Sequence, residues 1–595
     1  MIKNYNDAEL VDVHEKYRLL FLLWKELTDY RTMDSYQYRV MNSLNILQEL
    51  VDEINNRLCR YSITNHGVIE CKVEASDIIS KDSTIKTHFP QVYGQLLKHL
   101  NQKVETDMEL KALKYQIEYY YDLISKEYLT YLFDDLELSI DYSNHKEITM
   151  LVNMLISICV CLGWSIQALN SVVDELKGSA YSKDKWLSFK TLVTNQATKE
   201  FIVFIPLKLN YKYANTDKNT LVNKVHAEIK SMGIDVCYKC KIGSKYPQVI
   251  SYLNDNSPYM VVTVDGFDPF SACYSAINKC SNALNLLSFF NYTEAWNVKN
   301  NVFMVCDSSN TVVSLVKERK LFSTYDYLES SQKIYSATKD LVGSNDPNTS
   351  VKNKLISSFS YANHAKAAVL QEEKLMNLWV ALESLCRSDV YENIISNVLE
   401  AVPPALCIRY MYRLFRNFLE DCLRCGLDFD SVSIQIENRD RSEIVRDIIA
   451  LMRDSSRYSA FLGKCSINAL LVVRCEEIHE LATDEDKAVA RIRKHYTNVR
   501  RQLARLYRIR NGIAHSAMDG RGSLGIFIEH LSDYLSCFIS EIVMYSTTEH
   551  EYRAEVIFEI FKDNYQTFIE LAKPSNKAGN CLLSNFQASG IIDLI

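Results

Sequence analysis

The sequence predicts a mainly α-helical protein with a central α+β domain. Glycine and proline are scarce, at 16 and 9 of 595 residues, which argues against long flexible linkers. Apolar residues recur at helical spacing over most of the chain, and β-rich runs occur only between about residues 185 and 320. A chain of this length corresponds to roughly three or four domains of ordinary size.

Residues 1–180 are expected to form a helical N-terminal domain. Two series of apolar residues with helical spacing indicate its first helices: Leu19, Leu20, Leu22, Leu23 and Leu27, then Leu44, Leu47, Leu50, Val51 and Ile54. The role of this domain is left open, and sensing or regulation is the expectation.

One segment of this domain has the composition of a membrane span. No residue from Ile148 to Val173 is charged, and Met150–Trp164 is strongly apolar. Polar residues interrupt the stretch, and a helix buried in the middle of a large helical domain has a similar composition. We therefore expect a buried helix, and a membrane-tethered protein is the alternative.

Residues 185–345 are expected to form a small α+β domain. A helix is predicted over Pro269–Phe290, with the proline in its first turn. Four runs rich in β-branched and aromatic residues predict strands, of which the last two form a hairpin: Phe201–Ile205, Met260–Val264, Asn301–Val305 and Thr311–Val316.

The remainder of the chain is predicted to be helical from residue 346 to about 570. The run Asp346–Ser350 combines proline with short polar residues and is the expected linker into this domain. Residues 571–595 are expected to form a C-terminal tail.

Charge and cysteine content limit the class of protein. The net charge is −7, so any site for a polyanion must be a local basic patch. The 17 cysteines are scattered without the spacing of a small disulfide domain, which fits thiols kept reduced in a cytosol. The N-terminus has no apolar signal region, and we expect a cytoplasmic protein.

Two cysteine pairs have the spacing of zinc ligands. Cys237 and Cys240 form the first pair, and Cys422 and Cys425 form the second, about 180 residues further along the chain. No matching histidine pair accompanies them. We expect two unrelated thiol pairs, no metal site and no cofactor.

A basic run from Lys487 to Met518 is the strongest local charge feature. It contains no aspartate or glutamate and includes Arg500, Arg501, Arg505 and Arg508. Such an excess along one helix is what a phosphate backbone requires, so these four arginines are the predicted RNA-binding residues. The alternative is that the arginines pair with acids elsewhere in the fold.

The basic run ends in Arg510-Asn511-Gly512-Ile513-Ala514-His515, which predicts catalysis of RNA cleavage. RNA supplies a 2′-hydroxyl nucleophile beside each phosphate, and a histidine can exchange protons near neutral pH. An arginine can hold the phosphate and offset developing charge, and an asparagine can orient either partner. The expected products are a 2′,3′-cyclic phosphate and a 5′-hydroxyl, and DNA should not be cut.

Helix geometry leaves three ways to complete this site. Asn511 and His515 share a helix face, whereas Arg510 and His515 are about 140° apart around the axis. A long arginine can swing toward that face, Gly512 can loosen the turn, or a second copy can complete the site in a symmetric dimer. His530, which follows the motif, could also approach the site.

The motif residues resemble the HEPN superfamily and, more closely, its Apea-like members. The family motif of arginine, asparagine and a histidine a few residues later is complete here, and Arg505–Ile509 is similar to the family's lead-in. Leu378–Leu385 resembles the family's upstream helix with tryptophan and glutamate. The resemblance covers about 345–550 well, 185–345 loosely and 1–180 not at all.

The resemblance implies a C-terminal HEPN-like helical bundle that is a metal-independent endoribonuclease and is often dimeric. It also implies an antiphage or toxin effector that cleaves tRNA or other cellular RNA, with a phage-derived or host trigger. We assign Arg510, Asn511 and His515 as catalytic, with Glu383 and Tyr507 as supporting residues. The alternative is a non-catalytic RNA-binding or scaffold protein of the same superfamily.

Overall fold

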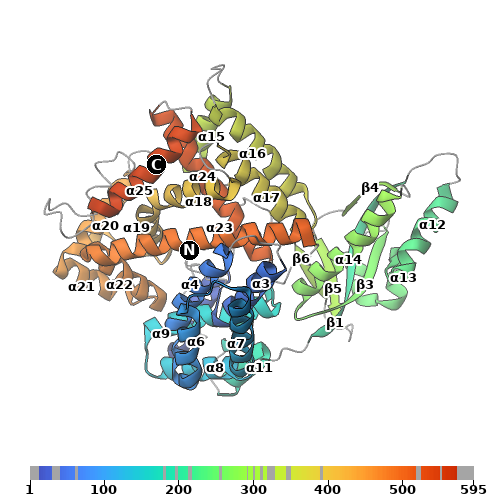
Figure 1. The fold of residues 1–595 in the computed structure, drawn as a ribbon, viewed down its shortest axis with the longest axis horizontal. Coiled ribbons are helices and arrows are strands. Elements are labelled where there is room, and N and C mark those ends of the chain that lie inside the picture. The colour runs from blue at the N-terminus through green and yellow to red at the C-terminus, as the bar shows by residue number, and fades with distance from the viewer. Residues whose placement is uncertain are drawn as a thin grey trace.

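The fold is mainly helical with a small antiparallel sheet, as the sequence predicts (Figure 1). The computed structural model describes residues 13–29, 41–59, 65–177, 183–194, 198–211, 218–253, 258–290, 293–298, 302–307, 313–317, 329–343, 350–388, 393–516, 524–549 and 553–571. The tail predicted over residues 571–595 and the linker predicted over 346–350 lie almost entirely outside these ranges.

The first part of the chain forms the N-terminal helical unit. Local signals begin its helices: the side chain of Asn42 caps α3, and Thr106 and Glu109 form a reciprocal capping box at α7. The helices are α2 (Arg18–Leu27), α3 (Ser43–Leu58), α4 (His66–Ser80), α5 (Ser83–His88), α6 (Pro90–Asn101), α7 (Asp107–Ser125), α8 (Tyr128–Asp141), α9 (His145–Leu162), α10 (Ile166–Val172) and α11 (Lys183–Thr194), with 3₁₀ turns Glu15–Tyr17 and Val173–Leu176.

Helix α9 contains most of the apolar segment that sequence composition alone could assign to a membrane. Among the described residues it is the one helix long and apolar enough to cross a membrane, and half of it is buried inside the protein. Leu151, Leu155 and Ile156 are fully buried, and α9 packs against α2, α3 and α8. This is the packing that we expected of a core helix.

The sheet unit follows, with strand order β2-β3-β1-β5-β6 and with β4 paired to β1. Two predicted strands, 201–205 and 260–264, lie within β1 and β3. The other two, 301–305 and 311–316, overlap β5 and β6 over their described residues and form the predicted antiparallel pair. Strands β2 and β4 were not predicted from the sequence. The strands are β1 (Lys199–Tyr211), β2 (Asp235–Cys237), β3 (Tyr259–Gly266), β4 (Thr293–Val298), β5 (Val302–Asp307) and β6 (Val313–Lys317).

Alternation along β1 places apolar side chains on both faces of the sheet. Val203 and Ile205 pack in a core with α14 (Pro269–Phe289), the helix predicted from its N-terminal proline. Ile202 and Phe204 face the other core, which contains residues of α13 (Lys239–Lys245) and the 3₁₀ helix Pro247–Tyr252. Helix α12 (Lys218–Ser231) packs beside β2.

The C-terminal helical unit contains the rest of the helices. Helix α15, which we had assigned to the central domain, packs instead against α16 and α24, so this unit begins before residue 346. Its helices are α15 (Glu329–Gly343), α16 (Ser350–Ala367), α17 (Gln371–Cys386), α18 (Ile394–Ile408), α19 (Tyr410–Arg424), α20 (Arg441–Arg453), α21 (Ser455–Cys465), α22 (Ala469–Thr483), α23 (Glu485–Ser516), α24 (Leu524–Glu549) and α25 (Ala554–Leu571), with a 3₁₀ turn Asp430–Val432.

The two helical units share one hydrophobic core. Helix α2 packs on α22, and the guanidinium of Arg474 on α22 bridges Glu26 on α2 and Asp421 on α19. Figure 1 shows the long helix α23 between the N-terminal helices on one side and α15–α18 on the other. Charged residues of α23 therefore lie at the junction between the two helical units.

Candidate active site on helix α23

Helix α23 carries the predicted motif in its last two turns. It is one continuous helix of 32 residues, about 48 Å long at 1.5 Å per residue. Its apolar face is fully buried, and it packs mainly against α17, α18, α22 and α24. The buried residues follow helical spacing: Ala488, Ile492, Val499, Leu503 and Leu506. This packing fixes the position of the helix that ends in the motif.

Arg510 and Asn511 are brought together by a direct hydrogen bond. The Nη1 of Arg510 donates to Oδ1 of Asn511 at 3.0 Å, so the guanidinium turns toward the helix face on which Asn511 lies. Both residues are half-buried. The Nε of Arg510 is buried and has no hydrogen-bond partner among the described residues. One guanidinium N–H therefore remains to be satisfied at this position.

His515 lies in the last turn of α23, and its side chain is outside the described residues. The helix continues through Gly512 to Ser516, so the glycine does not loosen the turn in this structure. Asn511 and His515 are four residues apart and share a face of a continuous helix. The Arg510–Asn511 bond directs the guanidinium toward that same face, which favours the swing of the arginine over the loosened turn.

The two supporting residues lie where α17 meets α23. The indole Nε1 of Trp379 donates to Oε1 of Glu383, one turn further along α17, at 2.5 Å. The ring of Trp379 packs against the ring of Tyr507, with centroids 5.7 Å apart. Glu383 therefore accepts a hydrogen bond from a neutral indole on its own helix. It fixes the tryptophan that in turn packs against the motif helix.

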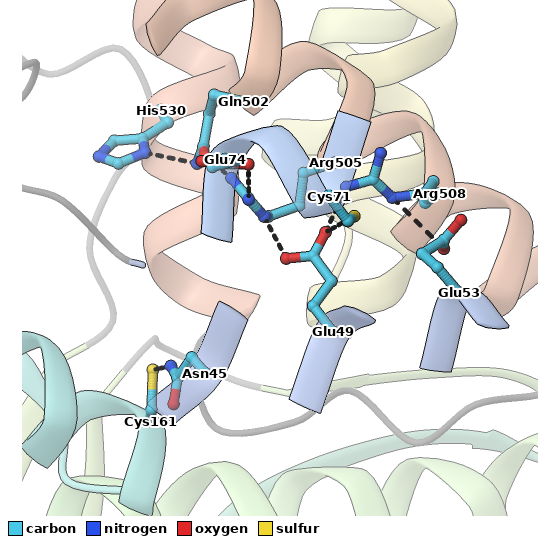
Figure 2. Close-up of polar contacts among 10 residues, drawn as sticks. All are labelled: Asn45, Glu49, Glu53, Cys71, Glu74, Cys161, Gln502, Arg505, Arg508 and His530. Atoms are coloured by element: carbon cyan, nitrogen blue, oxygen red, sulfur yellow. Dashed lines mark hydrogen bonds and ion pairs between the residues drawn. The ribbon is translucent and has the colours of Figure 1, made fainter. Parts of the chain in front are cut away.

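The four predicted RNA-binding arginines form ion pairs with acids of the same chain. In this structure they do not form the open basic surface that we expected, and the alternative of intramolecular pairing holds. Arg500 pairs with Glu400 on α18 at 3.2 Å. The other three pair with acids of the N-terminal helical unit, as Figure 2 shows for Arg505 and Arg508. The physical reason is burial, since a charge in the interface between two units requires a partner.

Arg505 lies at the centre of this network. Its Nε binds Glu49 at 2.7 Å and its Nη2 binds Glu74 at 2.7 Å. Arg508 shares Glu49 and lies 3.4 Å from Glu53. At the open edge, Arg501 binds Asp77 at 3.1 Å. We call this group of α3, α4 and α23 residues the inter-unit ion-pair network.

The network shifts the pKa values of its members in the direction of stronger pairing. Burial by itself would raise the pKa of Glu49, but the charges of Arg505 and Arg508 outweigh it and lower the pKa to about 2. Burial opposes the charge of the two arginines, yet Glu49 and its neighbours raise both of their pKa values. Glu53 behaves differently, because burial raises its pKa more than Arg508 lowers it.

His530 belongs to this network and not to the motif. Its Nδ1 bonds with Nε2 of Gln502 at 2.9 Å, and Oε1 of Gln502 accepts from Arg505 at 3.0 Å. Burial, with a further contribution from the charge of Arg505, lowers the pKa of His530 to about 4. The ring is therefore neutral at pH 7 and accepts the amide N–H, so it is not poised to exchange protons near neutrality.

Replacing His530 by glutamine should reduce the acid sensitivity of the fold. The unfolded chain takes up a proton near pH 6.5, but the folded ring does so only near pH 4. Stability is therefore lost as pH falls from 6.5 to 4, by roughly 3 kcal/mol at about 1.4 kcal/mol per pH unit. Urea unfolding of both proteins at pH 7 and at pH 4.5 measures this loss, and an unchanged pH dependence in His530→Gln would contradict it.

The two cysteine pairs lie in different parts of the fold. Cys237 is in a core of the sheet unit and Cys422 is in the shared helical core, which confirms that the pairs are unrelated. Within the described residues, no group of three or more His, Cys, Asp or Glu side chains is arranged to hold a metal ion.

A cavity of about 870 Å³ opens between α9, α22 and the first half of α23. Its walls include two stacked ring pairs, Tyr410 with His495 and Tyr458 with His479. Two of the cations in its lining pair with acids, Arg491 with Glu477 and Lys487 with Glu480. His495 is about 22 Å of helix rise from Arg510, so this cavity is separate from the motif.

The functional residues that sequence reasoning missed are the acids of α3 and α4. Glu49 and Glu53 are four residues apart on α3, and Glu74 and Asp77 are three apart on α4, so each pair shares a helix face. This spacing is the available signal, but it does not reveal which cations the acids meet. Comparison with family models, curated proteins and solved structures found no match for this chain.

Proposed function

We propose that this protein is a metal-independent endoribonuclease of the HEPN type, with Arg510, Asn511 and His515 at its active site. The C-terminal helical unit is the HEPN-like bundle in this proposal. The observation that carries it is the Arg510–Asn511 pair, in which Asn511 holds one guanidinium N–H while the buried Nε has no partner among the described residues. A phosphate oxygen is a suitable acceptor for such a donor.

The proposed reaction uses the 2′-hydroxyl of RNA as its nucleophile. The imidazole of His515 exchanges a proton with the attacking or the leaving oxygen, since its usual pKa is close to neutrality. The guanidinium of Arg510 binds the phosphate and stabilises the charge that develops on its oxygens. Asn511 orients the guanidinium through the bond already described. The oxygen that leaves becomes a 5′-hydroxyl, and the phosphate becomes a 2′,3′-cyclic ester.

Packing beside the motif supports the assignment of a rigid site. Trp379 is fully buried and is held between the carboxylate of Glu383 and the ring of Tyr507. An active site needs its groups held within a fraction of an ångström, and residues on packed helices meet that need better than residues on loops. The resemblance assigned importance to this same tryptophan–glutamate helix.

Two copies of the chain offer a second way to assemble the site. Arg510 and His515 are five residues apart on a continuous helix, about 140° around the axis. A symmetric homodimer that places two copies of this helix end together would bring the arginine of one chain to the histidine of the other. The biological role in this proposal is a regulated antiphage or toxin effector that acts on cellular RNA such as tRNA.

The test is cleavage of RNA in the absence of divalent metal. Purified protein is incubated with total RNA and EDTA, and the ends of the products are mapped beside those from His515→Ala and Asn511→Ala. We expect cyclic-phosphate ends from the native protein only, because His515→Ala has no proton-exchanging group. Cleavage that persists in His515→Ala, or that needs a divalent metal, would exclude this mechanism. RNA binding without such ends would indicate the non-catalytic alternative.

A further inference from the structure

Three arginines just before the motif are covered by carboxylates from the N-terminal helical unit. Arg501, Arg505 and Arg508 lie within eight residues of α23, about 10 Å along the helix axis. Each pairs with an acid of α3 or α4, more than 400 residues away in sequence. Figure 2 shows Glu49 reaching between Arg505 and Arg508, with Glu74 on the other side of Arg505.

These contacts have the chemistry of arginine bound to phosphate. A carboxylate presents planar oxygens that accept the same paired N–H groups as a phosphate does. The network holds four acids, Glu49, Glu53, Glu74 and Asp77, against the three arginines of α23, and Asp77 also pairs with Lys81.

The covered arginines lie on the same helix as the motif. Arg508 is two residues before Arg510, and no break in α23 separates them. An RNA strand whose phosphate is held at Arg510 could extend along α23 over Arg508, Arg505 and Arg501. In this structure α3 and α4 occupy that path, and Arg505 is only 3% exposed.

We propose that the carboxylates of α3 and α4 mimic an RNA backbone and compete with RNA for Arg501, Arg505 and Arg508. This inference rests on the proposed function and adds how the same site is regulated. The N-terminal helical unit holds the nuclease closed until the contact between the two helical units opens. A trigger that binds the N-terminal helical unit would act by weakening these ion pairs.

Binding of RNA, measured apart from cleavage, tests this competition. All proteins carry His515→Ala, and the probe is a fluorescently labelled single-stranded RNA of mixed sequence, followed by anisotropy at several salt concentrations. The released variant is Glu49→Gln with Glu74→Gln, which leaves Arg505 with no carboxylate and Arg508 with Glu53 alone. We expect RNA affinity to rise about tenfold, because Arg505 and Arg508 can then reach phosphates with less competition from carboxylates.

The salt dependence of RNA affinity gives a second measurement. It would not change if the carboxylates had a purely structural role. Each further phosphate contact steepens the dependence of log K on log salt by about 0.7 for a single strand. The released variant frees two arginines and should therefore be steeper by about 1.4. Asp77→Asn frees only the half-exposed Arg501 and should show a smaller change in the same direction. If circular dichroism shows that Glu49→Gln/Glu74→Gln does not fold, RNA binding by Asp77→Asn tests the competition instead.

Glu26→Gln is the matched control. Glu26 also forms an ion pair across the two helical units, but its partner Arg474 is on α22 and not on α23. We expect it to leave RNA affinity unchanged. Unchanged or weaker RNA binding in folded Glu49→Gln/Glu74→Gln and Asp77→Asn would overturn the competition.

Cleavage is then measured with His515 intact. Absence of cyclic-phosphate ends there would overturn the nuclease proposal alone, and a gain in binding would still support the competition.

Discussion

Replacing Arg510 by lysine is expected to slow RNA cleavage by about a hundredfold or more, since loss of one positioned donor to a developing charge has an effect of this size. A lysine keeps the positive charge but not the planar fork. The guanidinium of Arg510 can donate one N–H to Asn511 and another, from Nε, to the phosphate. A lysine ammonium cannot reproduce both bonds in this geometry. Single-turnover cleavage of a labelled RNA in EDTA measures the effect.

Arg493→Lys is the matched control for this substitution. Arg493 is exposed on the same helix, 17 residues before Arg510 and so about 25 Å away along the helix axis. Lysine is an equally good helix former there. We expect native cleavage from this variant. Equal rates for Arg510→Lys and Arg493→Lys would show that position 510 needs only a positive charge, and the phosphate-holding role would be wrong.

Replacing Arg505 by methionine is expected to lower the free energy of unfolding by about 3–5 kcal/mol, the usual cost of leaving a buried ionic group without its partner. Arg505 is buried and binds both Glu49 and Glu74. Its loss leaves Glu74 without this cation and leaves Glu49 with Arg508 alone. Equilibrium urea unfolding followed by circular dichroism measures the change.

A compensated variant separates charge from packing. Arg505→Met combined with Glu49→Gln and Glu74→Gln removes the carboxylates together with their cation, so most of the lost stability should return. Failure to recover would mean that the methionine, and not the uncompensated charge, disturbs this junction. Arg500→Met is a useful comparison, because Arg500 is partly exposed and pairs with Glu400 within the C-terminal helical unit.

The secondary structure of this protein was largely predictable because its signals are local. The proline at residue 269 and the aspartate before it mark the start of α14, and runs rich in β-branched and aromatic residues identified β1 and β3. Strand β2 has only three residues, which is too short for a periodic pattern. Helix α15 was predicted in the wrong unit because helical periodicity does not say which core a helix joins.

The helical class, the position of the sheet and the motif of Arg510, Asn511 and His515 on one helix can be predicted from local sequence patterns. The pairing of three arginines of α23 with acids of α3 and α4 is visible only in the folded chain: Arg501, Arg505 and Arg508 with Glu49, Glu53, Glu74 and Asp77. The physical reason is that helix periodicity depends on neighbours three or four residues apart, whereas an ion pair across a domain junction depends on how two distant helices pack. The sequence of α23 does not indicate which acids its arginines will contact, and the sequences of α3 and α4 do not indicate which cations their acids will contact.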